Sequence, residues 1–199
     1  PYHWPTTTHR RVAKAIAKLE SYIQAMVAAR REDTSGQYDD LLALLLHTQD
    51  EDDGAGMTDT QVRDELMTLF LGGQETTANA LTWTWYLLSQ HPAIYQRMLD
   101  EIDSVLAGRT PTTDDLPQLP YTLCVFQESM RLYPPVYMIP RKASRDFMLD
   151  GCHIPEGMAI IISPYTLHRN PAYFPEPEQF RPERFDPSAT PTFPRDAYI

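Results

Sequence analysis

The centre of the chain carries the stretch Gly72-Gly73-Gln74-Glu75-Thr76-Thr77, in the middle of a long apolar pattern. Two adjacent glycines are unfavourable inside a helix, because each costs about 1 kcal/mol relative to alanine. Their missing side chains let a flat, bulky ligand or another backbone approach closely. Because Thr76 is four residues after Gly72, its hydroxyl can donate to the Gly72 carbonyl and open a polar notch. On spacing alone, a tight helix crossing with Glu75 in solvent is the alternative interpretation.

The start of this helix is marked by several signals at Thr58. Thr58 can cap a helix, and Gln61 three residues later can complete a capping box. Met57 and Val62 are placed as a hydrophobic staple. The apolar pattern persists as far as His91-Pro92, so we predict a helix of about 30 residues and about 45 Å.

Helical periodicity predicts further helices in the first two thirds of the chain. We expect them at residues 12–31, about 40–47, about 93–107 and about 121–132. Gly108 is a typical C-terminal signal for the third of these helices. The run Gln49–Gly56 is acidic and contains glycines, which predicts a solvent-exposed loop.

The sequence period changes after Pro134-Pro135, where the last predicted helix ends. Residues 147–149 and 152–154 are typical of a β-hairpin with its turn at Asp150-Gly151, and residues 158–163 of another strand. The fold class expected is therefore mainly α with a small β region. We expect one partial domain, with residues 1–133 mostly helical, 134–169 forming the small β region and 170–199 a proline-rich coil.

Composition excludes several classes of function. The hydrophobic share of 42% is typical of an ordinary globular domain. A net charge of -10 argues against a nucleic-acid partner, because neutralising phosphates needs an excess of Lys and Arg. Cys124 and Cys152 lack the spacing of a zinc site or a disulfide framework, so we expect two reduced thiols.

The most apolar stretch, residues 66–88, is predicted to be a buried core helix. It contains Gln74, Glu75 and Asn79, and a charge at bilayer depth costs about 2.5–3.5 kcal/mol. Localisation cannot be read directly, because the sequence begins with Pro1 and we expect the true N-terminus to be absent. A soluble bacterial-type enzyme would be cytoplasmic, whereas an anchor on a missing N-terminus would make the protein membrane-associated.

Charged residues in the second half form a further pattern. Glu128 and Arg131 are three apart on one helix face and can pair, and a solvent-exposed pair worth about 0.3–0.5 kcal/mol is the default interpretation. Arg184 could complete a charged cluster if the coil folds back. Arg141 follows the apolar stretch Val136–Pro140 and has no acidic neighbour within four residues. Its planar guanidinium suits a carboxylate ligand, although an arginine in solvent fits equally well.

These features, in this order, resemble the cytochrome P-450 family. Gly72–Thr77 looks like the family's oxygen-activation motif, Ala/Gly-Gly-x-Asp/Glu-Thr-Thr/Ser, and Glu128-Ser129-Met130-Arg131 looks like its Glu-x-x-Arg. Phe180–Phe185 looks like the segment that supplies that motif's third charged partner. Further matches at similar separations are Leu132-Tyr133-Pro134-Pro135, Pro140-Arg141 and Leu167-His168-Arg169-Asn170-Pro171. The resemblance covers nearly the whole chain.

The resemblance implies a haem b bound against Gly72-Gly73 and Thr76, with Arg141 holding a propionate. It also implies that Glu75 and Thr76 are catalytic and pass protons to dioxygen at the haem. The residues implied to line the substrate pocket are Phe70, Gln74, Val136, Met138 and Ile139. The residues implied to form an architectural charge cluster are Glu128, Arg131 and Arg184.

One part of the family pattern is absent. The haem-ligand loop, Phe-x-x-Gly-x-Arg-x-Cys-x-Gly, does not occur, and the sequence stops at Ile199, about where this loop would begin. Neither Cys124 in the Glu-x-x-Arg helix nor Cys152 in the hairpin can be carried over as the iron ligand. We therefore assign no metal ligand to this chain and expect the 199 residues to bind haem weakly or not at all.

The function implied for the parent protein is that of a haem-dependent monooxygenase. It would activate O2 and hydroxylate an apolar organic substrate, with electrons from a ferredoxin or from a reductase using NAD(P)H. One alternative is a peroxide-dependent haem-thiolate enzyme, which the retained Glu75-Thr76 pair disfavours. Another is a non-catalytic helical remnant, which haem titration would distinguish.

Overall fold

The computed structural model describes residues 6–33, 38, 40–48, 54–188 and 193–199. The chain divides into two compact units, residues 1–75 and 76–199, and helix α3 (Asp59–Gln90) contributes to both. Whether the chain forms one partial domain stays a prediction.

The first unit consists of helices around a small apolar cluster. Helix α1 (Thr7–Glu32) and helix α2 (Leu41–His47) pack with the first turns of α3. The buried members of the cluster are Ile23, Val27, Leu42 and Val62, with Leu19, Leu46, Met57, Leu66 and Met67 packed against them. Helix α1 begins five residues before Val12, the first apolar residue of the predicted face, because the Oγ1 of Thr6 accepts from the backbone N–H of His9 and caps the helix.

Helix α2 is fixed to the end of α1 by a carboxylate. The Asp40 side chain caps α2 by accepting from the Ala43 N–H at 3.0 Å. It also accepts from Nη1 and Nη2 of Arg30 at 2.7 and 2.9 Å. Hydrogen bonding from Arg30, and then from the Ala43 backbone, lowers the pKa of Asp40 to about 2.

The predicted start of α3 is confirmed. The Thr58 N–H donates to Gln61 Oε1 at 2.9 Å, and the Gln61 N–H donates to Thr58 Oγ1 at 3.3 Å, so the capping box is complete. Met57 packs against the cluster that contains Val62, as the staple requires. The helix has 32 residues, close to the predicted length. Most of the loop predicted at residues 49–56 lies outside the described residues.

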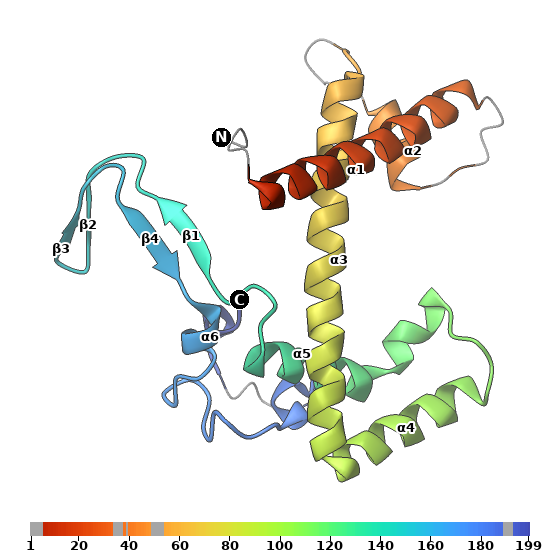
Figure 1. The fold of residues 1–199 in the computed structure, drawn as a ribbon. Helices are drawn as coiled ribbons and strands as arrows, with labels where there is room; N and C mark the ends of the chain where they lie inside the picture. The colour runs from red at the N-terminus through yellow and green to blue at the C-terminus, as the bar shows by residue number, and fades with distance from the viewer. Residues whose placement is uncertain (1–5, 34–37, 39, 49–53, 189–192) are drawn as a thin grey trace. The chain divides into compact units, whose positions relative to one another are not determined.

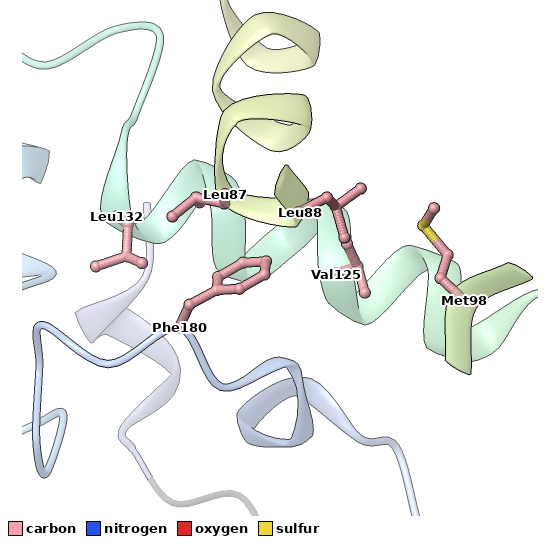
Figure 2. Packing of buried hydrophobic residues seen from close by; sticks show 6 residues of the cluster. All are labelled: Leu87, Leu88, Met98, Val125, Leu132 and Phe180. Atoms are coloured by element: carbon pink, nitrogen blue, oxygen red, sulfur yellow. The ribbon is translucent and has the colours of Figure 1, made fainter. Parts of the chain in front are cut away.

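The second unit has its main core between the end of α3 and two further helices, α4 (Pro92–Leu106) and α5 (Pro120–Leu132). A short 3-10 turn, η1 (Thr113–Gln118), lies between α4 and α5. Figure 2 shows Phe180 reaching from the C-terminal coil toward the helices. The buried core residues are Leu87, Leu88, Met98, Val125, Leu132 and Phe180.

The boundaries of α4 and α5 differ slightly from prediction. Both helices begin one residue early, because Pro92 and Pro120 occupy first-turn positions where the missing N–H costs nothing. Helix α4 ends at Leu106 rather than Ala107, because Ala107 itself adopts a left-handed conformation with φ of 48°. Gly108, the predicted glycine stop, directly follows Ala107 and has a φ of 84°.

The N-terminus of α5 is capped by a side chain of α4. The Glu101 carboxylate accepts from the backbone N–H of Tyr121 at 2.8 Å and of Thr122 at 2.7 Å. It also accepts from the Thr122 hydroxyl at 2.7 Å. Because the first N–H groups of a helix have no partner inside the helix, a carboxylate at this position satisfies them and interacts favourably with the helix dipole.

The β region consists of two antiparallel pairs. Strand β2 (Phe147–Leu149) pairs with β3 (Cys152–Ile154) in the predicted hairpin, with Asp150 and Gly151 at φ of 46° and 79° in the turn. Strand β1 (Ile139–Lys142) pairs with β4 (Ala159–Ile162), and the hairpin extends from the far end of this pair (Figure 1). The hairpin is confirmed, whereas the pairing of β1 with β4 was not predicted.

Three short helical segments in the last third of the chain were not predicted. Helix α6 (Pro164–Leu167) lies in the predicted β region, whereas η2 (Pro182–Phe185) and η3 (Arg195–Ala197) lie in the C-terminal coil. The η2 turn contacts α5, so this coil folds back against the helical part of the unit. The expected fold class, mainly α with a small β region, is confirmed.

Helix α3 is less buried than predicted. Leu69, Phe70 and Leu71 are exposed, so the prediction of a core helix holds only for part of its length. Within the described ranges, no helix combines the length and the apolar character needed to cross a membrane.

We expect Leu88→Ala to lower the free energy of unfolding by about 2–5 kcal/mol, because it leaves a cavity in a closely packed core. Leu88 is 2% exposed, whereas Leu81 on the same helix is 46% exposed and provides the matched control, Leu81→Ala. Urea unfolding followed by circular dichroism measures both. Equal losses for the two variants would contradict the described packing.

Candidate functional site

The centre of the second unit contains a buried ion pair on α5. Glu128 and Arg131 are both 0% exposed. Nε of Arg131 donates to Glu128 Oε2 at 2.7 Å, and Nη2 donates to Oε1 at 2.8 Å. The interpretation of this pair as a solvent-exposed one is therefore wrong. The burial of this pair could not be predicted from the helix sequence alone, because the residues that cover the pair come from the coil.

The coil adds the third charge. Nε of Arg184 lies 3.3 Å from Glu128 Oε1, and its Nη2 donates to the Glu176 carbonyl at 2.8 Å. The backbone N–H of Arg181 donates to the same Glu128 oxygen at 3.0 Å. Burial lowers the pKa of the Arg184 guanidinium, and the charge of Glu128 acts in the opposite direction. The structure thus brings Glu128, Arg131 and Arg184 together in one cluster.

Backbone carbonyls satisfy the remaining donors of Arg131. Nη1 donates to the His168 carbonyl at 2.8 Å, and Nη2 also reaches the Gln179 carbonyl at 3.2 Å. The guanidinium carbon lies 5.3 Å from the centre of the Phe174 ring. Because a buried charge is tolerated only when paired and hydrogen-bonded, these contacts fix the path of the coil around Arg131.

The sequence pattern indicated no separate role for His168, which is buried in the structure. It is 1% exposed, and its Nε2 accepts from the Ile199 N–H at 3.2 Å. Its ring stacks on Tyr198, with centroids 5.0 Å apart and an interplanar angle of 26°. Burial lowers the pKa of His168 to about 4, and the charges of Arg131 and Arg169 add to this effect. Its presence in the quoted stretch Leu167–Pro171 was the only signal for it.

The two-glycine turn of α3 is open within the first unit. In the part of residues 1–75 that the structure describes, a Cβ built at Gly72 or Gly73 would meet no atom within 4 Å. The alternative of a tight helix crossing therefore finds no support in this unit. Glu75 is exposed and Thr76 is half-buried. The hydroxyl bond from Thr76 to the Gly72 carbonyl stays a prediction.

Arg141 lies on β1 beside an apolar groove. Its side chain is exposed, and Nη1 donates to its neighbour's carbonyl, that of Pro140, at 3.0 Å. The groove has a volume of about 270 Å³. Its lining residues are Pro135, Val136, Tyr137, Met138, Pro140 and Ile161. Two of the predicted substrate-pocket residues, Val136 and Met138, thus line one groove, whereas Ile139 does not line it.

The other two predicted pocket residues, Phe70 and Gln74, are exposed on α3 in the first unit. Both cysteines are free thiols, as predicted: Cys124 is buried and Cys152 is exposed. Burial raises the pKa of the Cys124 thiol, which disfavours a thiolate at this position. Among the described residues, no cluster of His, Cys, Asp and Glu is suited to a metal ion.

Comparison with protein families gives a match to the model described as Cytochrome P450 over residues 2–199. Cyclooctatin synthase of Streptomyces melanosporofaciens is 39% identical over 98% of this chain and 42% of its own length. Cyclooctat-9-en-7-ol 5-monooxygenase of the same organism is 41% identical over 91% of this chain and 39% of its own. Pentalenene oxygenase of Streptomyces avermitilis is 38% identical over 98% of this chain and 43% of its own length. The chain thus spans about two fifths of the length of these relatives.

A solved structure, described as retinoic acid bound cyanobacterial CYP120A1, matches with a TM-score of 0.87 and 30% sequence identity. The match covers 99% of this chain and 45% of the other. The chain therefore has a fold already known from a longer protein.

We expect Arg131→Met to lower the free energy of unfolding by about 3 kcal/mol, because it leaves Glu128 buried with Arg184 as its remaining charged partner. The control is Arg181→Met, which removes an exposed pair with Glu176 and should cost under about 1 kcal/mol. Chemical unfolding of both variants gives the comparison. Similar losses would mean that the cluster does not behave as a buried one.

We expect His168 to make stability depend on pH. Its folded pKa is about 4, below the ordinary value of 6.5, so the unfolded chain binds the proton more tightly. The contribution is therefore complete above about pH 6.5 and is lost as the pH falls toward 4, at up to about 1.4 kcal/mol per pH unit. Unfolding measured over this range should show a shallower slope for His168→Gln. An unchanged slope would contradict the assignment.

Proposed function

Because the chain belongs to the cytochrome P450 family, we propose that the native protein is a haem-dependent monooxygenase that uses O2 to hydroxylate an apolar organic substrate. Bound haem b supplies the iron at which dioxygen is activated. Electrons come from NAD(P)H through a ferredoxin or a reductase. The observation that carries the proposal is the open two-glycine turn of α3, followed directly by a carboxylate and a hydroxyl.

The residues of this turn fit a flat ligand. Among the described residues of the first unit, the open space beside Gly72 and Gly73 leaves the backbone of α3 accessible to a planar macrocycle. Glu75 and Thr76 offer the two groups that proton delivery requires: an exposed carboxylate that can exchange protons with solvent, and a half-buried hydroxyl that can hold a proton or a water. We assign Thr76 to the haem side and Glu75 to the supply of protons.

The side chain of Arg141 fits a carboxylate ligand. Its guanidinium is exposed, and the part of the chain that the structure describes contains no ion pair of Arg141 with an acidic side chain. The propionate of a haem is a carboxylate whose geometry matches the planar fork of arginine. The iron-binding cysteine is proposed to lie outside these 199 residues, because Cys124 is buried in α5 and Cys152 lies in an exposed hairpin.

The substrate proposed is apolar and largely hydrocarbon. The groove beside Arg141 is lined by Val136, Met138 and other apolar residues, with few polar atoms to bind a polar compound. The names of two relatives describe the oxygenation of pentalenene, an alkene, and of cyclooctat-9-en-7-ol, an unsaturated alcohol. A compound of that class is therefore the first to test.

The proposed roles predict that Thr76→Val and Glu75→Gln slow product formation by about 10²–10⁴-fold in the complete native polypeptide, because each removes a proton-transfer group. Thr82→Val is the matched control, since the Thr82 hydroxyl is exposed and donates to the Ala78 carbonyl on the same helix. Product is measured with NAD(P)H and a redox partner.

Binding of haem is measured separately, from the absorption band of the ferrous carbon monoxide complex. We expect a thiolate-type band for the complete polypeptide and both variants, and none for the 199 residues alone. Unchanged rates in both variants, or turnover supported only by peroxide, would contradict the proposal.

A further inference from the structure

We propose that His168 is a positioning residue: its ring nitrogen holds the segment Pro194–Ile199, which leads toward the proposed iron-binding cysteine. The inference rests on the proposed function, because it concerns the placement of that ligand. His168 is a buried polar residue that the proposed chemistry does not use.

His168 joins the charge cluster to the last described residues. Its backbone carbonyl accepts from Nη1 of Arg131 at 2.8 Å, so its main chain is fixed by the buried arginine. Its Nε2 accepts from the Ile199 N–H at 3.2 Å. One residue thus connects the cluster on α5 with the backbone of the C-terminal segment.

Tyr198 strengthens the same connection. Its ring stacks on the His168 ring at 5.0 Å, and its hydroxyl donates to the Gln127 carbonyl of α5 at 3.2 Å. Burial raises the pKa of Tyr198 to about 12, so the hydroxyl keeps the proton that it donates. Phe185 packs edge-on against Tyr198 at 4.8 Å. The segment is therefore held by a ring contact on one side and a hydrogen bond on the other.

The tautomer of His168 indicates that its Nε2 is needed as the acceptor for the Ile199 N–H. Because Nε2 accepts from Ile199, the proton of the neutral ring is on Nδ1. Nδ1 is buried and has no hydrogen-bond partner among the residues that the structure describes. An unpaired buried donor is unfavourable, so packing alone would favour an apolar ring here. The bond to the Ile199 N–H is what an apolar ring could not provide.

A hydrogen bond at this position can affect a metal ligand further along the chain. Groups that orient the ligand-bearing backbone tune the geometry and the protonation of the ligand. A loosened segment would let a thiolate ligand move away from the iron and take up a proton. His168 would then influence the state of the ligand without contacting haem or substrate.

The test uses the complete native polypeptide loaded with haem, in the ferrous carbon monoxide state. His168→Phe keeps a ring against Tyr198 but removes the acceptor, whereas His168→Gln can place an oxygen near the position of Nε2. His91→Phe is the matched control, because His91 also packs on an aromatic ring, that of Phe180, and contacts a backbone carbonyl.

We expect the ratio of neutral-thiol to thiolate absorption bands to rise about fivefold in His168→Phe, which corresponds to about 1 kcal/mol for one hydrogen bond. His168→Gln should restore much of the wild-type ratio, and His91→Phe should not change it. A thiolate band in the wild type with equal ratios in His168→Phe and His91→Phe would overturn the inference alone, as would failure of His168→Gln to restore the ratio.

Absence of a thiolate band in the wild type would instead overturn the proposed function. If His168→Phe does not fold, Tyr198→Ala provides the test of the inference, because this variant removes the ring contact and leaves His168 intact. The same rise in the ratio is then expected, and an unchanged ratio would overturn the inference.

Discussion

The removal of Glu128 and Arg131 from water is the constraint on which the second unit depends. Burying an ion pair costs several kcal/mol per charge, and close partners must offset this cost. Beyond the two bonds that Glu128 and Arg131 make to each other, four partners come from the coil: a guanidinium from Arg184, a backbone N–H from Arg181 and carbonyls from Gln179 and His168. Helix α5 and the coil therefore cannot be ordered independently of each other.

This dependence supports the proposed chemistry indirectly. A haem-binding protein must hold residues from distant parts of the chain within a fraction of an ångström. The cluster fixes a coil that is poor in regular hydrogen bonds, and through His168 it reaches the segment at Tyr198 and Ile199. The proposed role of the glycine turn of α3 is to leave space for a ligand, and that role requires no such support.

Features that depend on a few adjacent residues could be predicted from the sequence. The capping box of Thr58 and Gln61 and the turn at Asp150-Gly151 are of this kind, because both atoms of each interaction lie within four residues. The pairing of β1 with β4 was missed, since a proline-bounded apolar run shows no strand period and its partner lies about twenty residues away.

The candidate site was predictable in a different way. The identity of its residues followed from motif order, but their environment did not. The pair of Glu128 and Arg131 has the spacing of any surface pair, and the residues that cover it lie 37 to 56 positions away in the sequence. His168 gave no signal of its own, because a buried histidine is recognisable only from what surrounds it.

The cap that Glu101 places on α5 links the behaviour of two helices. The first amides of a helix normally exchange their hydrogens through fraying of that helix alone. Here the amides of Tyr121 and Thr122 are protected by a carboxylate of α4, so they exchange only when α4 separates from α5. Their exchange rates thus report the opening of the contact between α4 and the helix that carries the buried ion pair.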